Sequence, residues 1–157
     1  MRYFTKTIIL VILILLTLNA CSSTSKSANI ISTDIMGVEW VLAEIRTGSK
    51  NIVLNRTSSK MKGFENSFTL YFDDNRLSGV GAPNRFFAPY KFGKNQTITV
   101  QPIASTLMAS IHELEILKEH EYFNFLQNVY KWNIVGGKLE LYTRNGDVET
   151  VLIYNLK

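Results

Sequence analysis

Short segments in which apolar and polar residues alternate, separated by turn signals, run through most of this chain. Residues 68–72 show the pattern clearly, and the turn-forming run 73–75 follows them directly. Alternation of this kind buries one face of a strand and leaves the other in solvent. The pairs Gly136-Gly137 and Asn145-Gly146 are signals for two-residue hairpins. These features favour a mostly antiparallel sheet of short strands joined by short turns.

We expect about eight strands and one amphipathic helix, which is an α+β fold. The helix is predicted over about 112–130, where Leu114, Leu117 and Leu126 recur at helical spacing beside an acidic face. It is expected to cover one face or one open end of a strongly curved sheet or incomplete barrel. The last strand carries apolar residues on both faces and should be central. The eight predicted strands cover residues 39–46, 68–72, 76–79, 85–92, 96–101, 131–135, 138–143 and 148–155, and a further short strand is considered over 52–54 within a solvated loop.

The segment 78–90 is expected to form a shaped loop held by aromatic side chains. Gly79 and Gly81 allow backbone conformations that other residues avoid, and Pro83 fixes φ and removes a donor. Most of the aromatic residues must lie in the core. A curved sheet covered by a helix can nevertheless leave an apolar cavity. The candidates for lining such a cavity are Phe86, Phe87, Tyr90, Phe123 and Leu126.

The first residues have the form of a secretory signal. Arg2 and Lys6 precede an apolar run over residues 8–18, and a small residue, Ala20, follows. The run of eleven residues would be about 16 Å long as a helix, against roughly 30 Å for a bilayer core. A transmembrane helix is therefore the poorer interpretation. We expect residues 1–20 to be a signal peptide, 21–34 a Ser-rich flexible tether, and 35–157 one domain.

The segment Leu18-Asn19-Ala20-Cys21 resembles the lipobox of bacterial lipoproteins. The resemblance implies that the Cys21 thiol carries fatty acyl groups and that the chain is cut just before it. Cys21 is the only cysteine, so no disulfide is possible within the chain. The alternative is ordinary cleavage near Ala20, which would leave a free thiol at Cys21.

Charge and motifs argue against several classes of function. Without Arg2 and Lys6 the 17 basic residues become 15 against 13 acidic ones, a net charge of +2. This balance is not typical of nucleic-acid binding. His112 and His120 lie among carboxylates that could ligate zinc, but the HExxH and HxxEH patterns are absent. We expect a solvated acidic helix face there, with no catalytic residue, metal or cofactor.

An ordered set of short motifs resembles the META domain, the HslJ-like heat-shock lipoprotein family. The resemblance covers residues 37–155. Its elements are Gly37-Val38-Glu39-Trp40-Val41-Leu42, Phe68-Thr69-Leu70-Tyr71-Phe72-Asp73, Ser78-Gly79 through Asn84-Arg85-Phe86-Phe87 and Tyr90, Ile103-Ala104-Ser105-Thr106-Leu107-Met108-Ala109, Leu126, and Trp132-Asn133-Ile134 through Leu139-Glu140-Leu141.

Two departures from the family pattern concern cysteine. The family often has Gly-Cys-Asn where this chain has Ala82-Pro83-Asn84, and Thr-Arg-Met-Ala-Cys where residues 106–110 read TLMAS. In the family these two cysteine positions lie side by side, and this chain lacks both cysteines, as expected if the two form a pair. Packing and Pro83 should hold the loop instead of a disulfide, which would contribute about 2–4 kcal/mol. Leu107 also replaces an arginine.

The resemblance implies a bacterial envelope protein linked to stress tolerance, without established catalytic residues. Our first hypothesis is a non-enzymatic lipoprotein with an interaction or scaffolding role. In a Gram-negative source the protein would be anchored to the periplasmic side of the outer membrane. Its partner would be an unknown envelope protein. The alternative is a carrier or pilotin-like module that binds an acyl chain or apolar peptide. A hydrolase or metal enzyme is a third hypothesis.

Overall fold

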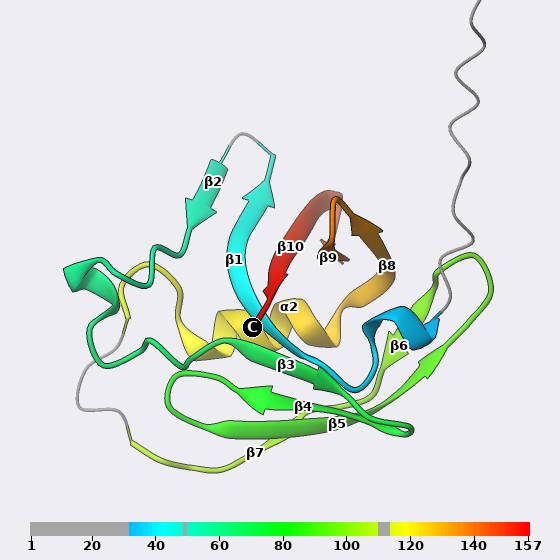
Figure 1. The fold of residues 1–157 in the computed structure, drawn as a ribbon, viewed down its shortest axis with the longest axis horizontal. Coiled ribbons are helices and arrows are strands. Elements are labelled where there is room, and N and C mark those ends of the chain that lie inside the picture. The colour runs from blue at the N-terminus through cyan, green and yellow to red at the C-terminus, as the bar shows by residue number, and fades with distance from the viewer. Residues whose placement is uncertain (1–31, 49, 110–113) are drawn as a thin grey trace, which may run out of the picture.

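Strands make up most of the fold in the computed structural model, which describes residues 32–48, 50–109 and 114–157 (Figure 1). The one α-helix of these residues is α2 (Glu119–Gln127), and two short 3-10 helices are η1 (Ser32–Ile35) and η2 (Ser59–Met61). This arrangement confirms the α+β class. The strands are β1 (Glu39–Thr47), β2 (Lys50–Val53), β3 (Thr69–Phe72), β4 (Arg76–Val80), β5 (Arg85–Phe92), β6 (Ile98–Val100), β7 (Ala104–Ser105), β8 (Val129–Val135), β9 (Lys138–Asn145) and β10 (Val148–Leu156).

The described strands form one antiparallel sheet that curls almost into a barrel. Its order is β6-β5-β4-β3-β1-β10-β9-β8, with β2 paired to β1 and β7 to β5. The two ends of the sheet meet at two contacts. Thr97 forms an isolated β-bridge with Lys131, and the backbone N–H of Trp132 donates a hydrogen bond to the Gln96 carbonyl (2.9 Å). The predicted incomplete barrel is confirmed, with a single seam between β6 and β8.

The interior of the barrel is filled by side chains. Tyr122 and Tyr154 are fully buried, and Phe68 packs edge-on against Tyr122 with ring centres 5.1 Å apart. Strand β10 lies between β1 and β9, and its neighbours Leu152 and Ile153 point to opposite faces yet are both buried. The prediction of a central last strand is therefore confirmed.

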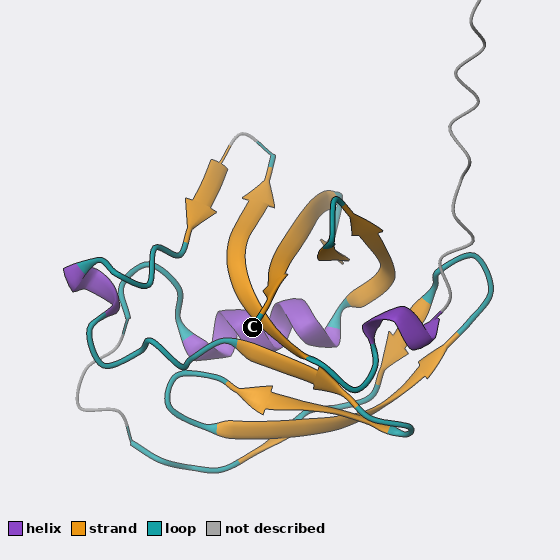
Figure 2. Ribbon diagram, viewed as in Figure 1, coloured by secondary structure: helices purple, strands orange, loops and turns teal. Residues whose placement is uncertain are grey.

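Helix α2 lies across the barrel and is shorter than predicted (Figure 2). The sequence predicted a helix over about 112–130, but residues 114–118 are not helical and Val129 already begins β8. Leu114 and Leu117 are buried from a non-helical segment, which explains why their spacing imitated a helix. The helix begins after Lys118, whose backbone N–H donates to Glu121 Oε2 (2.9 Å). It ends at Asn128, whose side chain donates to the Asn124 carbonyl (2.8 Å).

Ile35 anchors the first described residues of the domain to the core. Its side chain is fully buried, and its carbonyl accepts a hydrogen bond from Trp40 Nε1 (3.0 Å). The 3-10 helix η1 therefore includes the last three residues of the predicted tether. The predicted signal peptide, Cys21 and the rest of the tether lie outside the described residues.

Candidate functional site

A carboxylate from α2 holds the loop between β4 and β5. Glu119 is the first residue of the helix, and its Oε1 accepts hydrogen bonds from the backbone N–H groups of Ala82 (2.6 Å) and Asn84 (2.7 Å). Its Oε2 accepts a third bond from Asn84 Nδ2 (2.7 Å). These bonds have the short lengths of charge-assisted hydrogen bonds. Glu119 was expected on a solvated helix face, and this expectation was wrong.

The side chain of Asn84 joins the same loop to the segment that follows β7. Its Oδ1 accepts from Thr106 Oγ1 (2.8 Å) and from the Met108 backbone N–H (2.7 Å). Its Nδ2 also donates to the Met108 carbonyl (3.3 Å). Asn84 is buried, and both ends of its amide are paired. Three segments that are distant in sequence therefore meet at one amide.

The two glycines of the loop region are required by close approach rather than by turn geometry. A Cβ on Gly81 would lie 2.5 Å from Glu119 Oε1, in the place that the carboxylate occupies. A Cβ on Gly79 would lie 2.1 Å from the carbonyl oxygen of Thr69, which is backbone and cannot swing aside. The absence of side chains at these positions lets β4 and the loop pack closely.

The residues proposed to line an apolar cavity are divided between two faces of the sheet. Phe86 and Leu126 are buried in the core, and Phe86 packs against Phe123 with ring centres 5.1 Å apart. Phe87 points to the opposite face of β5 and is 48% exposed. The Tyr90 ring packs edge-on against Phe72, and its hydroxyl donates to the Asp73 carbonyl (2.7 Å). Burial, followed by Asp74 and Asp73, raises the pKa of Tyr90.

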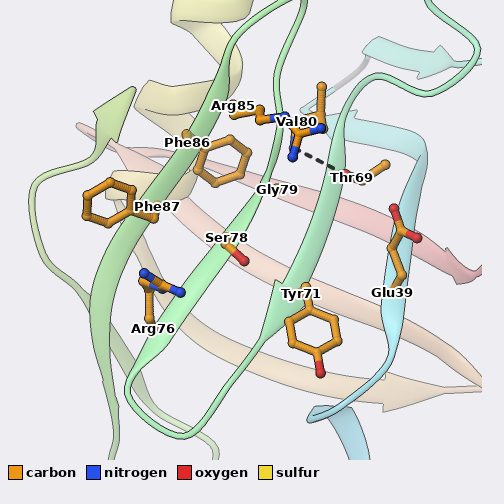
Figure 3. Close-up of a pocket in the computed structure, with 10 residues that line it drawn as sticks. All are labelled: Glu39, Thr69, Tyr71, Arg76, Ser78, Gly79, Val80, Arg85, Phe86 and Phe87. Atoms are coloured by element: carbon orange, nitrogen blue, oxygen red, sulfur yellow. Dashed lines mark hydrogen bonds between the residues drawn. The ribbon is translucent and has the colours of Figure 1, made fainter. Parts of the chain in front are cut away.

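An open groove of about 580 Å³ lies on the outer face of β3, β4 and β5 (Figure 3). Its floor is the stretch Ser78-Gly79, which carries almost no side chain. Tyr71 and Phe87 flank this floor from the neighbouring strands, and Ser78 pairs with both in the sheet. Tyr71 is 37% exposed, so the two rings present aromatic surface to solvent. A groove of this size is within the range of small-ligand sites.

The charge of the groove is positive. Arg76 and Arg85 both line it, and no ion pair joins either guanidinium to a carboxylate among the described residues. The Arg76 guanidinium lies over the Phe87 ring, with its carbon 5.6 Å from the ring centre. The acidic lining residue, Glu39, forms a salt bridge with Lys157 (3.0 Å). An anion in the groove would therefore meet two unneutralised arginines.

Buried polar groups elsewhere serve to hold the fold. Arg56 donates to the carbonyls of Glu65 (2.9 Å), Ser67 (2.9 Å) and Leu42 (2.8 Å), and its burial lowers the pKa of its guanidinium. The Tyr122 hydroxyl donates to the Thr69 carbonyl (3.2 Å), and burial raises the pKa of this phenol. The donors of Arg56 and Tyr122 are directed at backbone carbonyls, so these side chains stabilise the positions of loops and strands.

Sequence reasoning missed Glu119, Arg56 and the Arg76–Arg85 pair. Alternation along β4 and β5 was the available signal for the arginines, because Arg76 shares a face of β4 with Ser78, and Arg85 shares a face of β5 with Phe87. Their nearness followed only from the observed register. No three histidine, cysteine, aspartate or glutamate side chains in the described ranges form a group that could hold a metal. His112 and Glu113 lie outside those ranges.

Comparison with solved structures places this fold among known ones. A protein from Burkholderia xenovorans, solved by NMR, has a TM-score of 0.59 at 18% identity, over 78% of this chain and 83% of that one. A DUF4847 family protein from Bacteroides vulgatus ATCC 8482 has a TM-score of 0.53 at 12% identity, over 77% of this chain and 93% of that one. At such identities the similarity concerns the fold alone.

Comparison with protein families is more specific. No curated protein matches this chain. The model of the META domain matches residues 33–153, which includes strands β1 to β9 and ends within β10. The chain therefore belongs to the META domain family.

Proposed function

We propose that this protein is a non-enzymatic lipoprotein of the bacterial envelope, whose META domain serves an interaction or scaffolding role connected with stress tolerance. The observation that carries the interaction role is the outer groove, which combines exposed aromatic rings with two unpaired arginines. The polar groups with the most hydrogen bonds, Glu119, Asn84 and Arg56, are engaged in holding loops. The link with stress is supported by the resemblance to HslJ-like proteins.

The membrane anchor is supported by the N-terminal sequence. The segment Leu18-Asn19-Ala20-Cys21 has the form of a lipobox, and the buried Ile35 follows Cys21 by fourteen residues. A flexible chain of that length reaches about 20 Å, so the domain would stay close to the membrane surface. None of the helices found within the described ranges combines the length and the apolar character needed to cross a membrane.

Metabolic labelling tests the anchor. Cells that express the full chain are fed an alkyne analogue of palmitate, and labelled protein is detected in the membrane fraction. Cys21→Ala should abolish both the label and the membrane association, while Ser22→Ala, the adjacent change, should leave both intact. An unlabelled wild-type protein with a free thiol at Cys21 would contradict the proposal.

The second candidate is a carrier or pilotin-like module that binds an acyl chain or apolar peptide. The exposed rings of Tyr71 and Phe87 favour it. Tyr122 and Tyr154 are fully buried inside the barrel, and the groove is an open site on which such a ligand could lie. Native mass spectrometry of the purified protein distinguishes the two roles, since a carrier should retain bound lipid and an interaction domain should not.

A further inference from the structure

We propose that the groove over β4 binds an extended acidic segment of a partner protein. This inference specifies the partner in the interaction role proposed above. It depends on the groove alone and not on the lipid anchor, so the two can fail separately.

The positions of the arginines set the spacing of the ligand's charges. Arg76 lies at one end of β4, and Arg85 pairs with Val80 at the other end. The two basic positions are therefore four strand residues apart, roughly 13 Å at about 3.3 Å per residue. In an extended peptide, residues i and i+4 lie on one face at the same separation. Two carboxylates at this spacing would each reach one guanidinium.

The shape of the middle of the groove determines which kind of ligand residue fits between the two charged residues of the ligand. The floor at Ser78 and Gly79 is low, and the rings of Tyr71 and Phe87 stand on either side of it (Figure 3). An apolar side chain at i+2 would lie between the rings over this floor. Residues i, i+2 and i+4 of an extended strand share one face, as Arg76, Ser78 and Val80 do. The groove thus matches an acidic–apolar–acidic pattern at alternate positions.

Charge complementarity favours an acidic ligand over a neutral or basic one. The Glu39 carboxylate is already paired with Lys157, so it does not cancel the field of the arginines. The Arg76 guanidinium lies over the Phe87 ring, and a cation–π contact of this kind lowers the cost of ordering the side chain when a ligand binds.

Fluorescence anisotropy tests the proposal with the purified full chain. The probe is a labelled heptapeptide with aspartate at its second and sixth positions, leucine at the fourth and glycine elsewhere. The matched probe has asparagine in place of both aspartates. We expect the acidic probe to bind at least tenfold more tightly at low salt, with a difference that shrinks as salt rises. Equal binding of the two probes would overturn the proposal.

Variants place the binding in the groove. Arg76→Gln and Arg85→Gln should each weaken binding about three- to fivefold, as expected for partly exposed charge pairs, and the double variant about tenfold or more. Ser78→Phe should block the floor. Lys94→Gln removes one positive charge from the turn after β5, outside the groove, and should have little effect. Thermal unfolding of each variant confirms that it remains folded.

Two further arms exclude other anionic ligands. An oligogalacturonate of similar length offers carboxylates on a sugar chain, and vesicles with phosphatidylglycerol offer a lipid surface. The assignment to a protein partner would be overturned if the acidic peptide fails to bind, and if the oligogalacturonate or the vesicles bind the wild-type protein but not the Arg76→Gln/Arg85→Gln variant. Peptide binding that survives both this double variant and Ser78→Phe would overturn the assignment to the groove.

Discussion

Removal of the Glu119 carboxylate should loosen the loop between β4 and β5 and destabilise the whole domain. The carboxylate accepts three hydrogen bonds, two from backbone N–H groups of the loop and one from Asn84 Nδ2. We consider two substitutions. Glu119→Ala removes every acceptor, and Glu119→Gln keeps the size of the side chain and one acceptor oxygen.

The magnitude follows from what each substitution leaves unpaired. Hydrogen bonds to a charged group contribute about 1.5–3 kcal/mol each, and a buried donor left without a partner costs about 1–3 kcal/mol. These contributions are not additive, and water can reach part of the cavity left by alanine. We expect a loss of about 3–5 kcal/mol for Glu119→Ala. For Glu119→Gln we expect about 1.5–3 kcal/mol, because the amide oxygen can still accept from Ala82 and Asn84 while its NH2 group would face Asn84 Nδ2.

Urea unfolding followed by tryptophan fluorescence measures the loss, since Trp40 and Trp132 are both buried. The control is Glu115→Gln, which removes a carboxylate from an exposed position four residues earlier and should change stability by less than about 0.5 kcal/mol. A Glu119→Gln protein as stable as the control would refute the reasoning.

A double substitution separates a specific pairing from a general effect of charge. Asn84→Asp puts a carboxylate oxygen opposite Glu119 and should be strongly destabilising by itself. In Asn84→Asp/Glu119→Gln, the introduced amide NH2 can donate to the introduced carboxylate. The double variant should therefore be more stable than the sum of the single effects by about 1–2 kcal/mol.

Three further outcomes are expected. Gly79→Ala should cost about 1–3 kcal/mol in urea unfolding, because its Cβ would lie 2.1 Å from the Thr69 carbonyl oxygen and the strands must move apart; stability equal to wild type would show that they do so freely. Arg56→Met should cost about 2–4 kcal/mol, since three carbonyls lose their donor, and Arg56→Lys should recover part of the loss; no recovery would point to lost packing alone. Burial and, after it, the hydrogen bond to Glu140 raise the pKa of Tyr142 to about 12, above the unfolded value of about 10. The stabilisation by the neutral phenol is thus complete below pH 10 and lost as pH rises towards 12, so Tyr142→Phe should flatten the alkaline fall in stability measured by urea unfolding; an unchanged slope would contradict this assignment.

The strands could be predicted because their signals are local. The alternation in 68–72 and the apolar run in 151–154 both depend on which side chains face the core. Strands β3 and β10 begin and end within one residue of the expected bounds. The helix was predicted too long because burial alone does not report conformation. Leu114 and Leu117 reach the core from a non-helical segment, and their spacing of three is common to both arrangements.

The groove and the loop contacts could not be predicted because they depend on register. Arg76 and Arg85 are nine residues apart in sequence, and only the pairing of β4 with β5 places them along one face. Glu119 is 35 residues from Asn84, and its acidic neighbours in the sequence made a solvated face the simplest interpretation. Long-range pairs of this kind leave no periodic trace in a single sequence.

Hydrogen bonds from Asn84 hold the loop between β4 and β5 in this chain, in which positions 83 and 110 are not cysteine. Asn84 makes three hydrogen bonds to Thr106 and Met108, and at about 0.5–1.5 kcal/mol each they contribute about as much as the 2–4 kcal/mol of a disulfide. The two devices differ in what they require. A disulfide forms only under oxidising conditions, whereas an amide pairs as soon as the strands are in register. The loop should therefore form in this chain whatever the redox state of its surroundings, and a reducing agent should leave its unfolding curve unchanged.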